Sequence, residues 1–280
     1  MNKKLLSLAA IFACSSLTVL AAEEVVADTT AEVAAPAPAA TLFEEFVCPE
    51  IASNISLSMG VAYESEYVFR GLELGGGIVS PSVDLEYSLN DQISFYAGYW
   101  GAYGVDSEGD VANENDLYLG VNYAATDFMT VSFGYTAYTY VGGDHTNEIG
   151  LIFSFDTSSL FANGLDLAPY IAVFYDFDLD SQFVIETGIS YSIPVSQYIT
   201  GGDWGSIDLA YYMGYADYAT MALKYGGADY FYTGFGVDFS VAVTESCGFS
   251  VGLRYAYNTA DGLEDCNSNL WFGTSMSIGF

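Results

Sequence analysis

The chain has 280 residues, of which 36 are acidic and only 5 are basic, so its formal net charge is −31 at pH 7. This balance excludes nucleic acid as a partner, because phosphate binding needs a basic surface. Strongly acidic chains are often disordered, but 52% hydrophobic and 16% aromatic residues argue against disorder here. We therefore expect an ordered protein with separate apolar and acidic faces.

Residues 1–22 have the features of a secretory signal peptide. Lys3 and Lys4 precede a short apolar run, and residues 19–22 are small enough for cleavage. The run is shorter than the ~20 residues of a membrane-spanning helix. Cys14 offers an alternative, a lipoprotein cleavage site, to which the residues before it fit poorly. The sequence predicts export and cleavage near the end of this segment.

Residues 23–53 differ in composition from the rest of the chain. They are rich in Ala, Val and Thr, contain Pro36 and Pro38, and show neither helical nor strand periodicity. Such a composition predicts a periplasmic linker. Residues 42–47 could form one or two helical turns, either within a flexible leader or as a plug inside the domain that follows.

Residues 54–280 form one series of alternating apolar and polar positions, separated by turn signals. This period is typical of strands with one apolar and one polar face. Most of the segments exceed the ~9–11 residues that a tilted strand needs to cross the hydrocarbon layer. The predicted strands are 54–70, 78–89, 93–104, 115–125, 129–141, 147–156, 168–177, 182–193, 204–216, 229–243, 248–258 and 269–280.

This even number of strands allows both ends of the domain to lie on the periplasmic side. We expect an all-β fold, a transmembrane antiparallel up-and-down β-barrel of twelve strands. A soluble barrel or sandwich would carry its apolar face inside and its acidic face outside. Composition alone does not separate the two arrangements.

The last predicted strand favours the membrane arrangement. Its apolar residues share one parity, and small residues occupy most of the other. An uncovered apolar edge strand is an aggregation template in water, whereas a transmembrane barrel pairs its last strand with its first. The ending on Phe280 also resembles the C-terminal signal of bacterial outer-membrane barrels, which implies recognition by the barrel-assembly machinery.

Three short turns predict the register of neighbouring strands. Residues on one face of an antiparallel hairpin pair when their numbers have a constant sum, and a two-faced sheet requires apolar to meet apolar. Turns at 90–92, 126–128 and 245–247 predict the pairs Tyr87 with Phe95, Asp84 with Gly98, Tyr123 with Val131, Asn122 with Ser132, Val241 with Val251, Val243 with Phe249, and Asp238 with Arg254.

The same alternation predicts the faces of the barrel. The lipid-facing residues are mainly aliphatic and aromatic, and the lumen residues are mainly acidic, interspersed with Gly, Ser and Ala. The predicted pore-lining residues are Glu64, Glu66, Arg70, Asp84, Glu86, Asn122, Glu148, Asp176, Asp178, Glu186, Asp208, Asp238 and Arg254.

Residues 65–71, Ser-Glu-Tyr-Val-Phe-Arg-Gly, close the first predicted strand. This segment resembles the signature of the TorF-like porin family of Gram-negative bacteria, and residues 81–87 match the second strand that follows it there. Family members usually continue with Ile-Ser, where this chain has Leu72 and Glu73. The resemblance covers residues 54–280 and implies a diffusion channel, but it names no substrate.

His145 follows Asp144 in a predicted outer loop. An Asp–His pair at a barrel rim is similar to that of the omptin proteases, and barrel phospholipases pair Ser with His. Both enzymes need further partners, so a plain loop residue is the simpler interpretation. We predict no catalytic residue.

The acidic segments 106–116 and 176–180 could hold a weak Ca²⁺ or Mg²⁺ ion. However, both lack the Gly and Glu that an EF-hand loop requires at its sixth and twelfth positions. Solvated rim carboxylates are the default interpretation, and we predict no metal and no cofactor.

Cys48 and Cys247 are expected at the same end of the barrel, where an oxidising periplasm permits a disulfide between them. Cys266 is expected in the last outer loop. It would lie a membrane thickness away from Cys247, too far for a bond.

These features predict an outer-membrane porin, monomeric or trimeric, through which small solutes diffuse passively across the lipid. Carboxylates along the path would concentrate cations and repel anions. Arg70 and Arg254, held by acidic neighbours, would shape the constriction. Two alternatives remain open: a structural or adhesive barrel filled by side chains and residues 42–47, and an outer-membrane hydrolase that uses His145.

Overall fold

A computed structural model describes residues 53–105, 113–141, 143, 145–161, 167–178, 182–195, 198, 205–217, 229–260 and 268–280. The predicted signal peptide and nearly all of the predicted linker lie outside these ranges, and so do Cys48 and Cys266. Among the described residues, no helix is long and apolar enough to cross a membrane.

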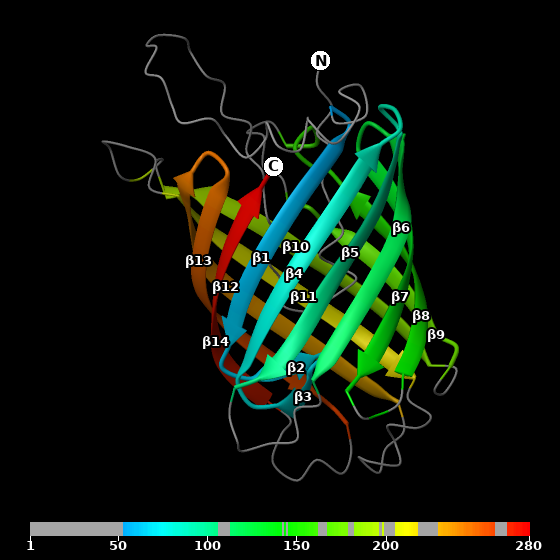
Figure 1. Cartoon of the computed structure of the whole chain (residues 1–280), viewed down its shortest axis with the longest axis vertical. Coiled ribbons are helices and arrows are strands. Elements are labelled where there is room, and N and C mark those ends of the chain that lie inside the picture. Colours follow the sequence, from blue (N-terminus) through cyan, green and yellow to red (C-terminus); the bar gives the residue numbers. More distant parts are fainter. Residues whose placement is uncertain are drawn as a thin grey trace.

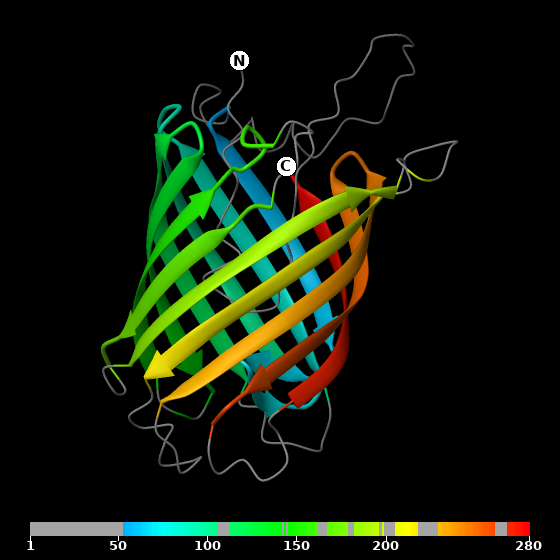
Figure 2. The same ribbon diagram turned by 180° about the vertical axis from the view of Figure 1, so that it is seen from behind.

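Twelve strands form a closed antiparallel barrel, which confirms the predicted fold class (Figures 1 and 2). Each strand pairs with its neighbours along the chain, and β1 closes the ring by pairing with both β4 and β14. The barrel strands are β1 (Ile55–Glu64), β4 (Ile78–Ser88), β5 (Ile93–Gly104), β6 (Glu114–Thr126), β7 (Met129–Tyr140), β8 (His145–Phe155), β9 (Tyr170–Asp176), β10 (Phe183–Pro194), β11 (Ser206–Asp217), β12 (Tyr230–Thr244), β13 (Cys247–Asn258) and β14 (Ser268–Gly279).

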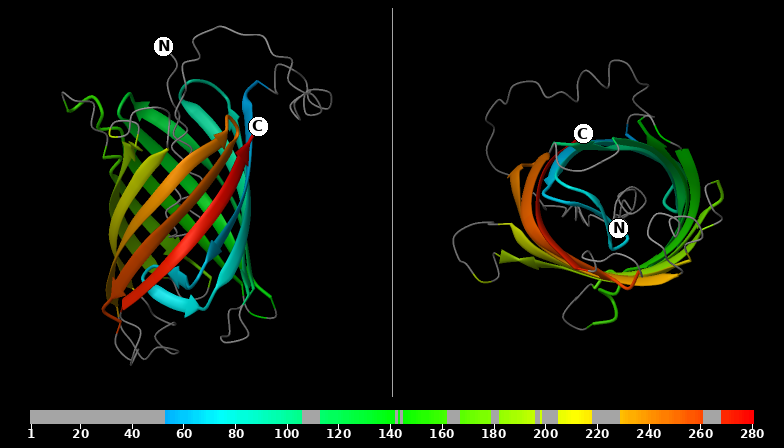
Figure 3. Two further views of the ribbon diagram at one scale, coloured as in Figure 1. Left: turned by 90° about the vertical axis from the view of Figure 1, so that its left-hand side faces the viewer. Right: turned by 90° about the horizontal axis from the view of Figure 1, so that it is seen from below.

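The first predicted strand, 54–70, is wrong in its second half. β1 ends at Glu64, and the chain turns inward to form a separate hairpin of β2 (Tyr67–Phe69) and β3 (Leu72–Gly75). Figure 3 shows this hairpin, in cyan, inside the ring of strands. We call the end of the barrel where it lies the hairpin end, and the end where β1 begins and β14 finishes the terminal end (Figure 1).

The predicted alternation explains the two faces of the wall. From β1 to β13, odd-numbered residues of the barrel strands face outward and even-numbered residues face inward, and in β14 the parity is reversed. Many outward side chains are large, apolar and exposed; Leu117, Phe133 and Leu253, for example, are 62%, 50% and 58% exposed. An exposed apolar surface this extensive marks contact with lipid or with other proteins.

Two of the three predicted registers are confirmed and one is wrong. Tyr87 faces Phe95 and Tyr123 faces Val131, as expected. In β12 and β13, an irregularity between Ala242 and Thr244 shifts the pairing. The observed pairs are therefore Val241 with Phe249, Asp238 with Gly252, and Gly236 with Arg254.

The inner wall changes along the barrel. Near the terminal end it carries small serines, most of them half-buried, together with the fully buried Ser94, Asn122 and Ser132, whereas toward the hairpin end it carries large buried aromatic side chains. The serines are Ser56, Ser58, Ser82, Ser192, Ser206, Ser240, Ser275 and Ser277, and the aromatic residues include Trp100, Tyr138, Phe174, Tyr230 and Tyr232. The side chains therefore leave more room in the terminal half than in the hairpin half.

Several inward tyrosines lie flat against the wall, each over a glycine on the neighbouring strand. A Cβ atom added to the glycine would overlap the tyrosine ring, so the position requires a residue without a side chain. The cross-strand pairs are Tyr96 with Gly120, Tyr118 with Gly98, Tyr170 with Gly188, Tyr212 with Gly234, and Tyr232 with Gly214.

Gly120→Ala should destabilise the barrel by about 1–3 kcal/mol, the usual cost of overpacking a filled site. The added methyl group would meet both the Tyr96 ring and the Phe133 carbonyl oxygen. Thermal unfolding of the refolded protein in detergent measures the change. Gly279→Ala is the matched control, because no atom lies within 4 Å of its added Cβ. An equal loss in both variants would contradict this packing role.

Candidate functional site

The β2–β3 hairpin contacts the barrel wall on both sides of its base, which lies between β1 and β4. On one side, Val68 packs with Ala256 and Trp271 of β13 and β14. On the other, the Tyr67 ring lies 5.9 Å from Trp100 of β5, measured between centroids. The tip of the hairpin reaches Glu148 of β8, five strands from β1 along the ring, so the hairpin extends across the lumen and narrows it at the hairpin end.

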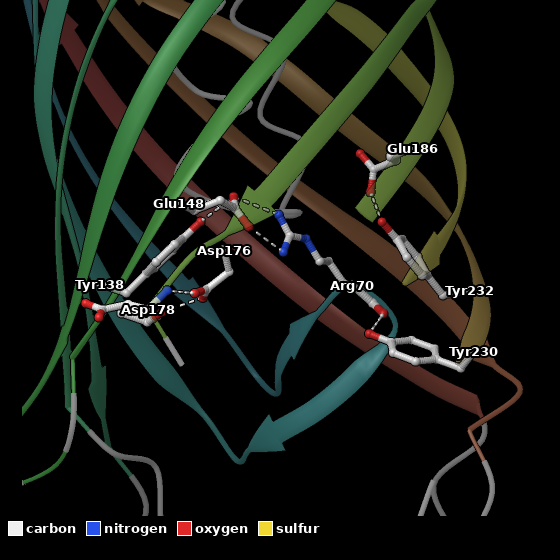
Figure 4. Close-up of polar contacts among 9 residues, drawn as sticks. Arg70, Tyr138, Glu148, Asp176, Asp178, Glu186, Tyr230 and Tyr232 are labelled. Carbon is white, nitrogen blue, oxygen red and sulfur yellow. Dashed lines mark hydrogen bonds and ion pairs between the residues drawn. The ribbon is translucent and has the colours of Figure 1, made fainter. Parts of the chain in front are cut away.

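Arg70, at the tip of the hairpin, forms a bidentate ion pair with Glu148 of β8 (Figure 4). Its two terminal nitrogens donate to the two carboxylate oxygens at 2.8 and 2.9 Å, and both side chains are buried. The guanidinium carbon also lies 4.7 Å from the ring centroid of Phe69 and 4.8 Å from that of Phe174. Planar contacts of this kind suit arginine and not lysine.

The backbone of the hairpin tip is fixed by side chains of the wall. Arg70 and Gly71 both have positive φ, of 48° and 78°, and Tyr230 donates to the Arg70 carbonyl oxygen at 3.2 Å. Asn258 donates to the Gly71 carbonyl oxygen at 2.7 Å. A Cβ at position 71 would lie 2.6 Å from the Tyr232 Cβ, so both the turn and the space require glycine here.

Tyrosine hydroxyls donate hydrogen bonds to other buried carboxyl groups near the hairpin. Tyr67 of β2 donates to Glu114 of β6 at 2.6 Å. Tyr170 and Tyr232 each donate to Glu186 of β10 at 2.7 Å. These carboxylates accept hydrogen bonds from neutral donors, which leave the negative charge in place.

Arg254 of β13 forms a second charged group on the inner wall. It donates to Asp238 at 3.0 Å and lies 3.6 Å from Glu64 of β1. Trp271 donates to the other oxygen of Glu64 at 3.0 Å. Arg254 was expected directly opposite Asp238. The shifted register places it diagonally, and the two side chains still meet on the same face.

We call the part of the wall around Asp84, Glu86 and Asp208 the acidic vestibule. These carboxylates lie toward the terminal end and are half-exposed. Hydroxyl groups donate to them: Ser94 to Glu86 at 2.5 Å and Ser192 to Asp208 at 2.6 Å. No described arginine forms an ion pair with any of the three.

The predicted pore-lining residues divide into two groups. On the inner face of barrel strands lie Glu64, Asp84, Glu86, Asn122, Glu148, Asp176, Glu186, Asp208, Asp238 and Arg254. Three residues lie elsewhere: Glu66 precedes β2, Arg70 lies on the hairpin, and Asp178 follows β9 at the rim. Asp178 accepts a hydrogen bond from Asn147 at the rim, and its place among the pore-lining residues stays a prediction.

Glu66 lies outside the barrel strands, close to the charged side chain of Glu73 on β3. Burial raises the pKa of the Glu66 carboxyl above its ordinary value, and the like charge of Glu73 raises it further. The hairpin base therefore carries a carboxyl that is protonated at higher pH than an ordinary glutamate.

His145 and Asp178 lie together at the exposed rim. Their closest atoms, Nε2 and Oδ2, are 3.7 Å apart, and the His145 side chain is 73% exposed. Asp144 lies outside the described residues. Across the described ranges, no group of three or more His, Cys, Asp or Glu side chains is arranged to hold a metal ion.

Glu114 and Asp116, which were expected in an acidic loop segment, are part of the barrel wall. Both belong to β6, face inward and are buried. Their parity matches that of Asn122, which also faces inward, so extending the alternation backward would have found them. The same parity also marks Tyr170 and Tyr232 as inward-facing, but it does not show that both hydroxyls bind Glu186.

A family model described as a bacterial protein of unknown function (Gcw_chp) matches residues 49–164. This span includes the hairpin and Glu148. No curated protein matches the chain in sequence. The resemblance to the TorF-like porins stays a prediction, because the matching model bears a different name.

Several solved barrels are similar to this chain in outline. An outer membrane channel from Pseudomonas putida F1 is 10% identical, with a TM-score of 0.48 over 81% of this chain and 96% of that one. The NanC porin is 13% identical, with a TM-score of 0.47 over 79% and 98%. LpxR from Salmonella typhimurium is 10% identical, with a TM-score of 0.46 over 80% and 99%. Identities this low assign no role to any residue of this chain.

Arg70→Met should destabilise the protein by about 3–5 kcal/mol, because it leaves the Glu148 charge buried without its partner. Glu148→Met should cost a similar amount for the same reason. The double variant should lose much less than the sum of the two, since neither charge remains. Denaturant unfolding in detergent provides this double-mutant cycle, and additive losses would contradict direct coupling.

Proposed function

We propose that this protein is an outer-membrane channel for the passive diffusion of small solutes, with a preference for cations. The closed sheet leaves no edge strand, and its outward side chains are apolar, as a barrel in lipid requires. The predicted signal peptide supports export, and the apolar outward parity of β14 supports its place in a lipid-facing wall. The proposal assigns no reaction to His145.

The single observation that carries the proposal is the charge of the inner wall. Each described arginine inside the barrel is paired: Arg70 with Glu148, and Arg254 with Asp238. The carboxylates of the acidic vestibule have hydroxyl partners only, so their charge faces the lumen. Rings of carboxylate charge select for cations in narrow aqueous paths.

The hairpin would set the size limit of the channel. It crosses the lumen at one end, while small serines line the other end. A solute would enter a wide acidic vestibule and then pass a narrow section beside the hairpin. Such a channel conducts small ions and excludes larger solutes.

Planar bilayers under a KCl gradient test the selectivity. We expect a reversal potential that indicates K⁺ preference, and it should fade at high salt, because the Debye length falls from ~10 Å at 0.1 M to ~3 Å at 1 M. The double variant Asp84→Asn/Asp208→Asn should lower the cation-to-anion permeability ratio by about two- to fivefold, since each charge contributes at most ~1 kcal/mol in water.

Asp217→Asn is the matched control for this experiment. Asp217 lies at the end of β11 on the outward parity, so its charge is outside the lumen and the ratio should not change. Anion preference in the wild-type protein would contradict the proposal.

A second candidate function is a structural or adhesive barrel with an occluded lumen. The observation that favours it is the packing around the hairpin: Leu72, Tyr96, Phe174 and Tyr232 belong to one cluster of buried residues that includes side chains from both sides of the barrel. If this packing seals the lumen, the protein has no conducting path.

Replacing residues 65–77 with a short Gly-Ser turn separates the two candidates. For a channel, wild-type protein conducts, and the variant should show a higher single-channel conductance with weaker discrimination by size. For an occluded barrel, wild-type protein is silent and only the variant conducts. Absence of conductance in both proteins would refute the channel.

A further inference from the structure

We propose that the inner wall beneath the hairpin binds an alkali metal cation, with Asp116 as its central ligand. Asp116 is only 1% exposed, and neither of its carboxylate oxygens has a hydrogen-bond partner. A buried carboxylate without a partner is strongly unfavourable as a free anion. Its charge must therefore be neutralised, either by a bound cation or by a proton that Asp116 shares with the adjoining carboxyl group of Glu114.

The surroundings of Asp116 carry more negative than positive charge. Glu114 lies two residues away on the same face of β6, and its carboxyl group contacts that of Asp116. It accepts a hydrogen bond from the neutral hydroxyl of Tyr67. The nearby Arg70 directs both terminal nitrogens at Glu148. Asp116 and Glu114 therefore lack a cationic bonding partner among the described residues.

Thr136 of β7 gives an independent indication of a ligand. Its side chain is also 1% exposed, and its hydroxyl oxygen has no hydrogen-bond partner. Thr136 pairs with Tyr118 on β6 and with Glu148 on β8. The next inward-facing pair between β6 and β7, two residues along each strand, is Asp116 with Tyr138. A hydroxyl oxygen thus lies diagonally across from the unpaired carboxylate, where it would complete a set of oxygen ligands.

Aromatic side chains enclose this part of the wall. Trp100 and Tyr138 flank Asp116 on the two neighbouring strands. The Tyr67 ring packs against Trp100 while its hydroxyl binds Glu114, so the hairpin covers the group from the lumen side. An ion held here would be largely stripped of water and bound by protein oxygens.

The ligand chemistry points to a hard monovalent cation. Carboxylate and hydroxyl oxygens suit hard cations and not thiophilic metals. Ca²⁺ takes six to eight oxygens and Mg²⁺ needs near-ideal octahedral geometry. Among the described carboxylates of this group, Glu114 accepts a hydrogen bond from Tyr67 and Glu148 pairs with Arg70, so Asp116 alone needs one positive charge, which Na⁺ or K⁺ supplies. Bound there, the ion would also stabilise the hairpin through Glu114 and Tyr67.

Thermal unfolding of the refolded full-length protein in detergent tests this site. The midpoint is measured in chloride salts of Na⁺, K⁺, Ca²⁺ and choline at equal ionic strength and pH. We expect a midpoint about 2–8 °C higher in Na⁺ or K⁺ than in choline, the shift produced by an ion that binds only the folded state. Conductance plays no part in this readout, so its failure leaves the proposed channel function intact.

Three variants assign the effect to the site. Asp116→Asn should abolish the difference between salts, and Thr136→Val should reduce it while leaving the charge unchanged. Asp208→Asn, a carboxylate of the acidic vestibule, should keep the full difference. Equal midpoints in all four salts would overturn the proposal. So would stabilisation by Ca²⁺ alone, or by acidic pH without any salt dependence, which would indicate a proton shared by Asp116 and Glu114.

Discussion

The pairing of β1 with β14 is the constraint on which the rest of the structure depends. In hydrocarbon, an unpaired backbone group costs several kcal/mol, so a sheet can span lipid only if its first and last strands meet. Ser58 opposite Gly279 and Glu64 opposite Gly273 mark the two ends of this closing ladder. Once the ring is closed, one parity of every strand points into the lumen and the other points out of the barrel. The apolar parity faces outward and the acidic parity faces the lumen.

Closure creates an interior that must be filled by side chains or by water. In this chain the hairpin end is filled by side chains, and the terminal end is lined by polar ones. Near the terminal end, serines and half-exposed carboxylates leave a polar space. At the hairpin end, β2 and β3 bring their own core into the lumen. Moving the hairpin out would break the Arg70–Glu148 pair and expose Val68 and Leu72, both of which are buried. Apolar burial holds the hairpin in place, and the bidentate pair sets its position.

Several carboxyl groups of the inner wall accept hydrogen bonds from neutral donors. Glu186 and Glu114 are bound by tyrosine hydroxyls, and Glu86 by a serine. A neutral donor lowers the cost of burying a carboxylate without cancelling its field. Tyrosines lie over glycines for a related reason: a flat ring covers the wall, reaches a neighbouring acid with its hydroxyl, and takes up little of the lumen. The many tyrosines and the many acids of this chain thus form one set of hydrogen bonds on the inner wall.

The sequence by itself determined the elements whose cause is local. Period-two alternation predicted eleven of the strands to within two residues, and turn length predicted the register of β4 with β5 and of β6 with β7. The tertiary structure decided the rest. Tyr67 and Phe69 continue the alternation of β1, so the inward turn is invisible until Glu148, 78 residues beyond Arg70, provides its partner. The irregularity after Ala242 and the unpaired oxygens of Asp116 likewise depend on neighbouring strands. Local patterns predict where a strand lies and which side chains share a face, because both follow from the pleat of a single segment. The occupants of the lumen are set by contacts between segments that only the closed barrel brings together.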